Sequence, residues 1–370
     1  MTRAELPVVP ALECRGLTVT YGSTPVLHEL DLTVGVAEAV ALLGPSGCGK
    51  TTLLYTVAGF VQPDAGRISI AGRVVAAGRH SEPPERRGVG VVFQNYALWP
   101  HLSALDIVAY PLRRSGLPKD EARRRSMSLL DRLGIARLAR SRPAQLSGGE
   151  QQRVGVARAL AREAPLYLFD EPTAHLDTAL RTVLQEELAE QRTALGAAVL
   201  YATHDVAEAF AVADRVALVR DGRIVQIASP QEVYERPVDL WAARLTGPAA
   251  VLEVCVAPDA AGSLVPRVAD ASVTGVSATG VLPVREGVAQ VLVRPEWARL
   301  GGPLPGRITS VRFRGSDTDY RLDTPAGTVE VRERGAPRAA VGDGTGWTLE
   351  RAWVLVSPAS SPDPSARPVR

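Results

Sequence analysis

The residues that most limit the fold of this chain stand at 44–51, where the sequence reads GPSGCGKT. They match the pattern G-x-x-x-x-G-K-[ST], whose glycines let backbone N–H groups approach phosphate oxygens closely. An apolar run at 39–43 precedes them, and a helical pattern at 50–60 follows them. A buried strand, a phosphate-binding loop and a helix N-terminus in this order predict an α/β fold that binds a nucleotide.

The residue types in this loop suit the different parts of a bound nucleotide. Lys50 places a positive charge on the terminal phosphates, and Thr51 offers a hydroxyl to Mg²⁺. We interpret Cys48 as a small residue whose side chain points away from the ligand, with a redox switch as the alternative. The loop alone does not separate kinases, GTPases and transporters. Its predicted nucleotide-binding residues are Gly44, Pro45, Ser46, Gly47, Cys48, Gly49, Lys50, Thr51 and Thr52.

Two carboxylates follow a second buried strand. Residues 166–171 read LYLFDE, so four apolar residues lead directly into Asp170 and Glu171. Asp170 is suited to hold Mg²⁺, and Glu171 to orient and deprotonate the attacking water. The alternative, a strand end with ordinary surface acids, loses weight because a phosphate-binding loop precedes it. His204, after the apolar run 197–203, is a third candidate that could contact the γ-phosphate beside Glu171.

The pattern of apolar residues in the first half predicts strands and a helical lobe. Half-buried strands are expected at 14–20 and 26–34. The polar stretch at about 95–163, with an Arg-rich helix at 119–133, predicts a separate helical lobe. Strands separated by helices again favour a layered α/β fold.

The pattern changes towards the C-terminus. The stretch 215–227 has two apolar runs around Asp221-Gly222, which predicts a β-hairpin. From Gly247 onwards, short Val-rich runs alternate with Gly and Pro, as is typical of a small all-β barrel or sandwich. The Pro/Ser-rich stretch 358–370 is predicted to be a disordered tail.

Bulk composition excludes several function classes. The formal net charge is only +2, so no strong overall field favours nucleic acid, and Arg123-Arg124-Arg125 is interpreted as a solvated helix face. No apolar run is long enough to cross a bilayer and no signal peptide is recognisable, so other chains would supply any membrane part. The cysteines are few and widely spaced, which favours a reducing compartment over a disulfide or zinc framework. They are Cys14, Cys48 and Cys255.

A second glycine motif carries a family resemblance. Residues 146–154 read LSGGEQQRV, in which Ser147 is expected to cap a helix and Gly148 and Gly149 bare its backbone. This predicts a second anion-binding helix end in one chain. Over about 12–245 the chain resembles the ABC transporter ATPases, whose signature LSGGQ is matched except that Glu150 replaces Gln.

The resemblance implies an ATPase that works as a dimer with ATP and Mg²⁺. Two subunits would pair head to tail, so that the Ser147 to Glu150 end of one covers the ATP held by Lys50 of the other. By the same resemblance, Tyr21 stacks on adenine, and Gln94 touches Mg²⁺ and the attacking water. The implied metal-binding residues are Thr51, Gln94 and Asp170, and Asp177 lies at the D-loop, where Ala174 replaces the usual serine.

The C-terminal part resembles a domain found in one branch of this family. VRPEW at 293–297 is similar to an element of the OB-like C-terminal β domain, called TOBE, of maltose, sulfate, polyamine and ferric-iron importer ATPases. The implied domains are an ATP-binding domain at 12–245, a β regulatory domain at 246–357 and a tail at 358–370.

The resemblance implies an importer motor at the cytoplasmic face of the cell membrane. Its partners would be a second ATPase subunit, identical or paralogous, two integral-membrane permease subunits and, indirectly, an extracytoplasmic substrate-binding protein, with no nucleic acid. The stretches LTGPAAVLEV and RFRGSDTDYRL lean towards iron, polyamine or quaternary-amine members. Two alternatives stay open: an exporter ATPase, and a non-transport ATPase acting on DNA or ribosomes. The β domain could also sense a regulatory ligand.

Overall fold

The structure is a computed structural model that describes residues 9–172, 192–193, 196–258, 264–268, 271–272 and 287–355, with the side chains of 255–289 left aside. It divides into two compact units, Met1–Pro230 and Gln231–Arg370. Asp177 and the tail at 358–370 lie outside the described residues. The domain limits expected from the sequence therefore stay predictions.

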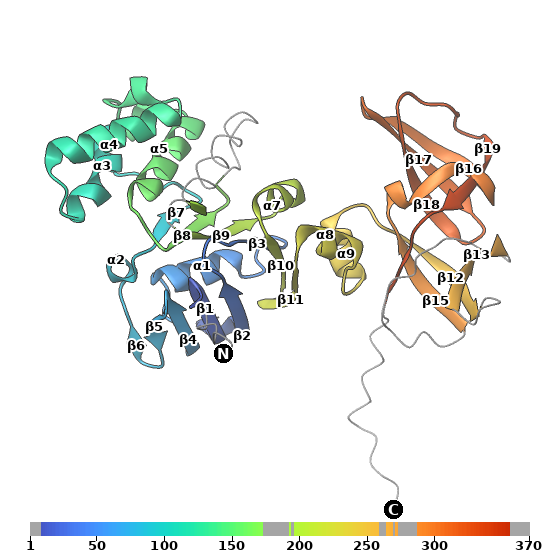
Figure 1. The fold of residues 1–370 in the computed structure, drawn as a ribbon, viewed down its shortest axis with the longest axis horizontal. Coiled ribbons are helices and arrows are strands. Elements are labelled where there is room, and N and C mark those ends of the chain that lie inside the picture. Colours follow the sequence, from blue (N-terminus) through green and yellow to red (C-terminus); the bar gives the residue numbers. More distant parts are fainter. Residues whose placement is uncertain are drawn as a thin grey trace, which may run out of the picture. The chain divides into compact units, whose positions relative to one another are not determined.

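The centre of the first unit is a six-stranded sheet in the order β11-β10-β3-β9-β8-β7 (Figure 1). Strand β3 pairs in parallel with β9 and β10, and β8 pairs in parallel with β9 and β7. Every residue of β3, β8 and β9 is buried, as expected for apolar runs inside a parallel sheet. The strands are β3 Ala39–Leu43, β7 Gly90–Val92, β8 Leu166–Asp170, β9 Ala198–Thr203, β10 Arg215–Arg220 and β11 Arg223–Ala228.

The parallel order places the candidate functional residues at one edge of this sheet. The carboxyl end of β3 leads into the phosphate-binding loop, that of β8 into Glu171, and that of β9 into His204. Ligands of open α/β sheets bind at this edge. The predicted hairpin between β10 and β11 is confirmed, because Asp221 and Gly222 both have positive φ, at 49° and 72°.

A second, antiparallel sheet of five strands has the order β2-β1-β4-β5-β6. Its first two strands match the runs expected at 14–20 and 26–34, whereas the other three were not expected. The hairpin that joins β4 and β5 turns at Ala71-Gly72, where both residues have positive φ. The strands are β1 Leu12–Tyr21, β2 Thr24–Val34, β4 Ala65–Ile70, β5 Arg73–Ala77 and β6 His80–Ser81.

Helix α1 (Lys50–Ala58) joins the two sheets in one core, where Leu54 belongs to the same buried cluster as residues of β1 and β3. Its C-terminal end is held by the fully buried Arg87, the last residue of α2 (Pro84–Arg87). The guanidinium donates to the carbonyls of Thr56, at 2.6 Å, and Val57, at 2.9 Å. A Cβ at Gly59 would lie 2.6 Å from Arg87 Nε, so only glycine fits this helix end.

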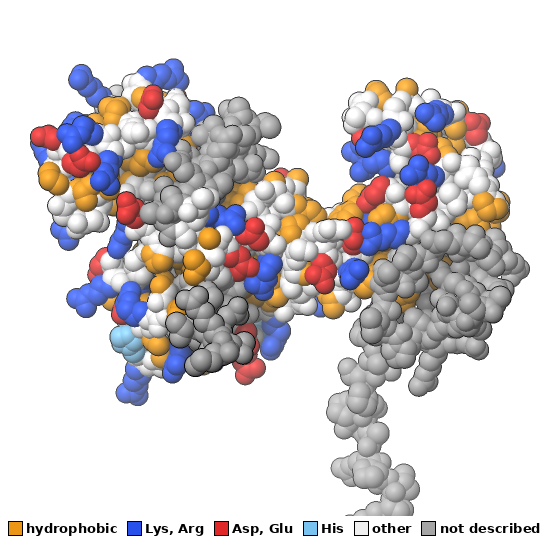
Figure 2. Space-filling view, viewed as in Figure 1, with side chains coloured by type: hydrophobic (Ala, Val, Ile, Leu, Met, Phe, Trp, Pro, Cys, Tyr) orange, Lys and Arg blue, Asp and Glu red, His pale blue; other side chains and the backbone are white. Residues whose placement is uncertain are grey.

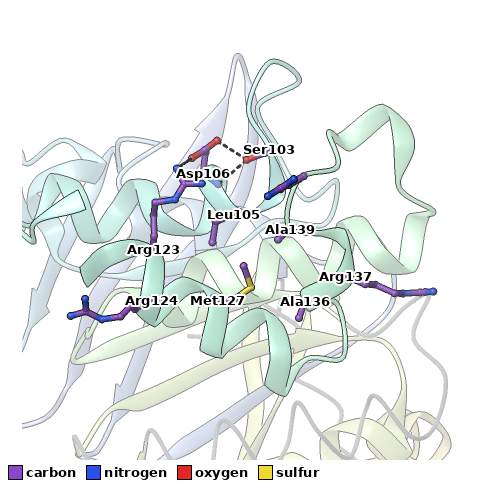
Figure 3. Close-up of a pocket in the computed structure, with 10 residues that line it drawn as sticks. Ser103, Leu105, Asp106, Arg123, Arg124, Met127, Ala136, Arg137 and Ala139 are labelled. Atoms are coloured by element: carbon purple, nitrogen blue, oxygen red, sulfur yellow. Dashed lines mark hydrogen bonds and ion pairs between the residues drawn. The ribbon is translucent and has the colours of Figure 1, made fainter. Parts of the chain in front are cut away.

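The predicted helical lobe is formed by three helices that share a core (upper left in Figure 1). Ser103 caps the first of them by accepting from the Asp106 amide (Figure 3). The lobe's elements are α3 Ala104–Arg114, α4 Lys119–Arg132, α5 Gly148–Ala161 and the short helices η1 Ala136–Leu138 and η2 Pro143–Gln145.

The arginine run on α4 is a solvated helix face, as expected. The side chains of Arg123, Arg124 and Arg125 are 44%, 72% and 53% exposed. Arg124 and Arg125 pair with Glu121 one turn earlier, and Arg123 lies 3.5 Å from Asp106. Figure 2 shows basic side chains spread over this lobe, and Figure 3 shows those that border the pocket between α3, α4 and η1.

The second unit is mainly β-structure, which confirms the predicted all-β domain. Two antiparallel sheets, β14-β13-β12-β15-β20 and β18-β17-β16-β19, enclose one apolar core. Two helices precede them. The elements are α8 Pro230–Glu235, α9 Leu240–Thr246, β12 Ala250–Pro258, β13 Leu264–Val268, β14 Ala271–Ser272, β15 Gly287–Val293, η3 Pro295–Trp297, β16 Ala298–Phe313, β17 Asp317–Thr324, β18 Gly327–Arg334, β19 Gly344–Leu349 and β20 Trp353–Val354.

The VRPEW element joins the helices to the sheets of this unit. Arg294 is fully buried and donates to the carbonyl oxygens of Ala243, at 2.9 Å, and Tyr234, also at 2.9 Å. Its guanidinium lies 4.1 Å from the centre of the Tyr234 ring. The Tyr234 hydroxyl in turn donates to Glu296. The motif therefore has a structural role in this unit, because one buried cation satisfies several backbone acceptors.

Candidate nucleotide-binding site

The loop after β3 has the geometry of a phosphate cradle. Gly47 and Gly49 have φ of 82° and 106°, which side chains rarely allow. A Cβ at Gly44 would lie 2.4 Å from the Val219 carbonyl oxygen, so this glycine is required by close packing. Helix α1 follows with no side-chain cap, so its first N–H groups can be used by an anion.

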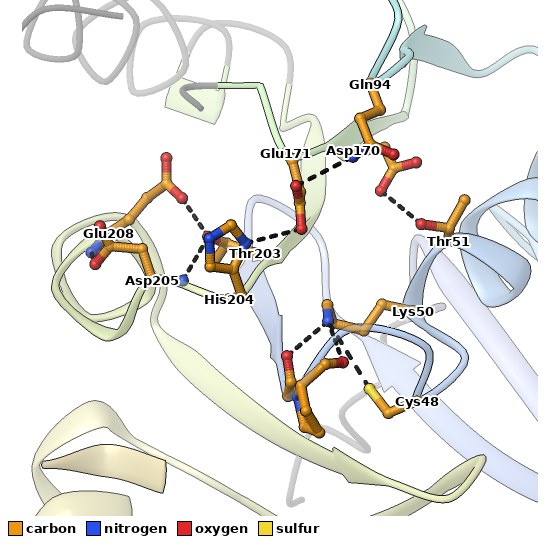
Figure 4. A network of polar contacts seen from close by, with 12 residues as sticks. Cys48, Lys50, Thr51, Gln94, Asp170, Glu171, Thr203, His204, Asp205 and Glu208 are labelled. Carbon is orange, nitrogen blue, oxygen red and sulfur yellow. Dashed lines mark hydrogen bonds and ion pairs between the residues drawn. The ribbon is translucent and has the colours of Figure 1, made fainter. Parts of the chain in front are cut away.

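Lys50 lies inside this cradle and is largely buried. Its Nζ donates to the carbonyl oxygens of Gly44, at 2.7 Å, and Pro45, at 3.0 Å (Figure 4). Cys48 Sγ is 3.8 Å from the same Nζ and belongs to the apolar core. Burial raises the pKa of the Cys48 thiol, which supports the interpretation of a packing residue, because the reactive form is the thiolate.

Thr51 and Asp170 form a pair that fits a magnesium ion. Thr51 Oγ1 donates to Asp170 Oδ1 over 3.0 Å, and Asp170 is only 1% exposed. The second oxygen, Oδ2, is buried without a hydrogen-bond partner among the described residues. Burial raises the pKa of Asp170, and the neighbouring Glu171 charge adds to this rise. A buried carboxylate with a free oxygen beside a hydroxyl suits a hard cation that prefers oxygen ligands.

Glu171 is where three candidate catalytic residues meet. Its Oε1 lies 2.9 Å from His204 Nδ1, and its Oε2 accepts from Gln94 Nε2 over 3.3 Å (Figure 4). The backbone at Glu171 has a φ of 47°, an uncommon conformation held by its amide donating to the Ala202 carbonyl. Residues from three strand ends thus converge on one carboxylate, which can accept a proton from a water placed between them.

The signature residues form a separate site on α5. Ser147 caps this helix in a capping box, because its hydroxyl accepts from the Glu150 amide over 3.4 Å and its own amide donates to Glu150 Oε2 over 2.9 Å. Arg137 Nη2 lies 3.3 Å from Glu150 Oε1. The hydrogen bonds from Ser147, and then the Arg137 charge, lower the pKa of Glu150. Gly148 and Gly149 form the first turn of the helix, as expected.

Tyr21 and an aromatic groove lie at other places on the first unit. Tyr21 ends β1 and is 51% exposed, so its ring is free to stack on a ligand. The groove has a volume of about 650 Å³ and includes Phe60, Phe93, Trp99 and Tyr110 in its lining.

One arginine organises the groove. Arg158 lies 5.8 Å from the Phe93 ring centre and 5.5 Å from the Trp99 ring centre, and it donates to the Ala97 carbonyl. Burial lowers the pKa of Arg158 to about 10. The groove therefore includes Ala97 and Trp99, which belong to the YALWPHLS stretch at 96–103.

Sequence reasoning missed two groups near the candidate residues. Glu208, on α7 (Val206–Val212), accepts hydrogen bonds from Tyr201 and Thr203, next to His204. The other group is Arg137, which lies 3.3 Å from Glu150. From the sequence, a glutamate on a short helix is expected to be exposed to solvent. Only the folded structure shows that Glu208 is buried. The structure buries both Glu208 and its neighbour Ala209, and no local pattern in the sequence signals this for the glutamate.

Comparison with known proteins identifies the chain. Residues 27–174 match the ABC transporter family model, and residues 291–356 match the TOBE domain. The spermidine/putrescine import ATP-binding protein PotA of Oleidesulfovibrio alaskensis is 39% identical over 331 residues, covering 85% of this chain and 86% of that protein. The chain belongs to the ABC transporter ATP-binding subunits.

Further similarities agree with this family. The Fe(3+) ions import ATP-binding protein FbpC 1 of Rhizobium meliloti is 40% identical over 329 residues, covering 88% of this chain and 91% of that protein. A bacterial ABC transporter cassette solved as a dimer aligns with a TM-score of 0.55 and 30% identity, over 59% of this chain and 98% of that one. The expected ABC ATPase fold, the importer-type TOBE domain and the binding of ATP are therefore confirmed.

Proposed function

We propose that this ABC ATPase drives solute uptake by closing as a head-to-tail dimer over two ATP molecules, with Glu171 as the base in each site. The observation that carries this is the meeting of His204 and Gln94 on the Glu171 carboxylate. Both neighbours can hold a water in line with the γ-phosphate while Glu171 takes its proton.

The other residues of the cradle bind and orient the nucleotide. Lys50 exchanges its two carbonyl partners for phosphate oxygens, and Tyr21 stacks on adenine. Thr51 and Asp170, with Gln94, are the residues that would hold Mg²⁺, which neutralises phosphate charge when bound. The Ser147 to Glu150 end of the partner subunit's α5 covers the γ-phosphate, and the resemblance assigns Asp177 to the D-loop.

We further assign the aromatic groove to the permease. Phe60 and Tyr110 are 51% and 44% exposed, which is unusual for large rings and typical of a contact surface. Two permease subunits would each place a short helix in one groove, holding the ATPase peripherally at the cytoplasmic face of the membrane. Among the described residues, no helix is long and apolar enough to cross the bilayer by itself. An extracytoplasmic binding protein would deliver the solute.

The solute we favour is a cation, either a polyamine or ferric iron. Relatives named for spermidine and putrescine import and relatives named for Fe(3+) import reach similar identity, 39% and 40%. Uptake of labelled spermidine and of ferric iron by cells lacking this chain distinguishes the two. Uptake restored by the wild-type chain but not by Lys50→Ala identifies the cargo. If both uptakes are normal without the chain, this assignment is wrong.

The variant Glu171→Gln tests the proposed mechanism. We expect ATP to bind normally, hydrolysis to fall by about 10²- to 10⁴-fold, and a closed dimer to accumulate, because a base and its charge are lost. Hydrolysis is measured by phosphate release and dimer formation by size-exclusion chromatography with ATP. Glu163→Gln is the matched control, since the Glu163 side chain is 71% exposed. Wild-type turnover by Glu171→Gln would refute the mechanism.

A further inference from the structure

We infer that Glu208 is a positioning residue for ATP hydrolysis, which acts through Thr203 to fix the backbone that carries His204. This inference rests on the proposed role of His204 beside Glu171. It is carried by a buried hydrogen-bond network at the junction of β9 and α7, which Figure 4 shows next to the candidate catalytic residues.

The carboxylate of Glu208 is buried, with 8% of the residue exposed. Its Oε1 accepts from the Tyr201 hydroxyl over 2.5 Å, and its Oε2 accepts from the Thr203 hydroxyl. Tyr201 and Thr203 are two residues apart on β9, so their side chains point to the same face of the sheet. A buried carboxylate is costly unless donors satisfy it, so these two donors fix where Glu208 can lie.

The Thr203 hydroxyl also reaches the chain on the far side of His204. While it donates to Glu208, its oxygen accepts from the Asp205 amide over 3.0 Å. Asp205 Oδ1 then accepts from the amides of Ala207, at 2.8 Å, and Glu208, at 3.2 Å, and so caps α7. His204 is therefore held between two residues that are each anchored to the helix carrying Glu208.

This anchoring matters because, among the residues that the structure describes, little besides the contact with Glu171 orients the imidazole. The His204 side chain is 59% exposed, so packing restrains it weakly, and its position follows from its backbone. The same strand end also holds the base, since Ala202 accepts from the Glu171 amide over 2.9 Å. The Glu208 network thus sets the 2.9 Å contact between His204 Nδ1 and Glu171 Oε1.

The substitution Thr203→Val tests this by removing the hydroxyl while keeping the shape of the side chain. We expect kcat to fall on the order of 10²-fold, the effect of a misplaced catalytic group. ATP affinity should stay within about two-fold, since Lys50 and Thr51 are untouched. Thr203→Ser keeps the hydroxyl and should restore turnover. A kcat for Thr203→Val within about two-fold of wild type overturns the inference.

Thr318→Val is the matched control for loss of a buried hydroxyl. Thr318 is 1% exposed and its hydroxyl donates to the Gly335 carbonyl over 2.7 Å, within the second unit. We expect it to lower thermal stability without changing kcat. Should Thr318→Val reduce kcat as much as Thr203→Val, the effect is one of general stability and the inference fails.

Two further measurements distinguish a positioning role of the Glu208 network from a merely structural one. In a His204→Ala background, Thr203→Val should cause no additional loss of kcat, because it acts through the residue already removed. The chain has five histidines, so imidazole NMR signals are few, and His204→Ala assigns the one of interest. Thr203→Val should shift only that signal. An unchanged His204 signal, or additive losses of kcat, would overturn the inference.

Glu208→Gln provides a second variant if Thr203→Val does not fold. It keeps the volume but turns an amide donor towards a hydroxyl donor, so the same changes in kcat and in the His204 signal are expected. Failure of the proposed function is distinguishable: it shows as full turnover in Glu171→Gln. If Glu171→Gln is inactive while Thr203→Val and Glu208→Gln turn over normally, only the positioning role is refuted.

Discussion

Two helix N-termini in the first unit face anions in different ways. Helix α1 begins after Gly49 with no side-chain cap and no acidic residue in its first turn. Helix α5 begins after Ser147 with a complete capping box that includes Glu150. Both present the positive end of a helix dipole. The difference shows that α1 is open to an external anion, whereas α5 is already satisfied by its own side chains.

This difference suits the two helix N-termini to different steps of the proposed ATP cycle. In the free chain the Ser147 hydroxyl donates to the Glu150 carboxylate, so it turns to a phosphate only if the phosphate is the stronger acceptor. A phosphate would also meet the Glu150 carboxylate, whose charge Arg137 partly offsets at 3.3 Å. On the proposed mechanism, the α1 end binds ATP in a single chain, while the α5 end binds ATP already held by another.

The largest expected effect comes from a substitution at the uncapped N-terminus of α1. Lys50→Ala removes the cation of the cradle, and we expect ATP affinity to fall on the order of 10- to 100-fold, the range for hydrogen bonds to a charged group. Calorimetric titration with ATP measures this. Lys119→Ala, at the exposed start of α4, is the control. Unchanged affinity in Lys50→Ala would mean that the two ends do not differ as described.

Mixed dimers test whether α5 serves the other chain. With Lys50→Ala and Ser147→Ala on separate chains, one shared site keeps both residues and hydrolysis should persist. With both changes on one chain, each of the two sites lacks one residue. Hydrolysis should then be roughly 10-fold slower than in the dimer with the changes on separate chains, if the lost hydroxyl contributes about 1.4 kcal/mol to the transition state. Phosphate release by tagged, co-purified dimers measures it. The reverse order of activities would contradict sharing between chains.

The pKa values of the acids near the two helix ends are shifted in opposite directions, raised for Asp170 and lowered for Glu150. Burial raises the pKa of Asp170, so the native state holds this proton more tightly than the unfolded state does. The stability from the protonated form is lost as pH rises through that pKa, so ionised Asp170 destabilises the free protein at pH 7. Asp170→Asn should raise the thermal midpoint at pH 7, and the gain should shrink as pH falls through the raised pKa of Asp170 and vanish below about pH 4. A lowered midpoint at pH 7 would contradict this assignment.

The smallest effect is expected at Glu150. Glu150→Gln keeps the cap but removes the charge next to the shared phosphate, so ATP-driven dimerisation should strengthen by about two- to five-fold, as for an exposed ion pair. Arg137→Gln should weaken it similarly, and should have no effect in a Glu150→Gln chain. Analytical ultracentrifugation with ATP measures both. If Arg137→Gln weakens dimerisation equally in the wild-type chain and in the Glu150→Gln chain, Arg137 does not act through Glu150.

Local patterns made most of the site predictable. Ser147 and Glu150 are three residues apart, and Asp170 and Glu171 follow one apolar run, so their chemistry is visible in the sequence. Gln94 was expected in the site only through family resemblance, and its contact with Glu171, 77 residues away, was not predicted. Glu208 escaped notice because its burial depends on how α7 packs on β9. The strands β4 to β6 were missed because their apolar runs are short and broken by turns.

The clamp at the far end of α1 has a mechanical consequence. Arg87 fixes the last carbonyls of this helix and also donates to the Glu82 carbonyl, and Gly59 leaves no room for another side chain there. The helix therefore has the phosphate-binding loop at one end and a buried guanidinium fixed to the other. Since Arg87 lies just before β7 and Gln94, we expect a displacement of that segment to be passed along α1 to the phosphate-binding loop instead of unwinding the end of the helix.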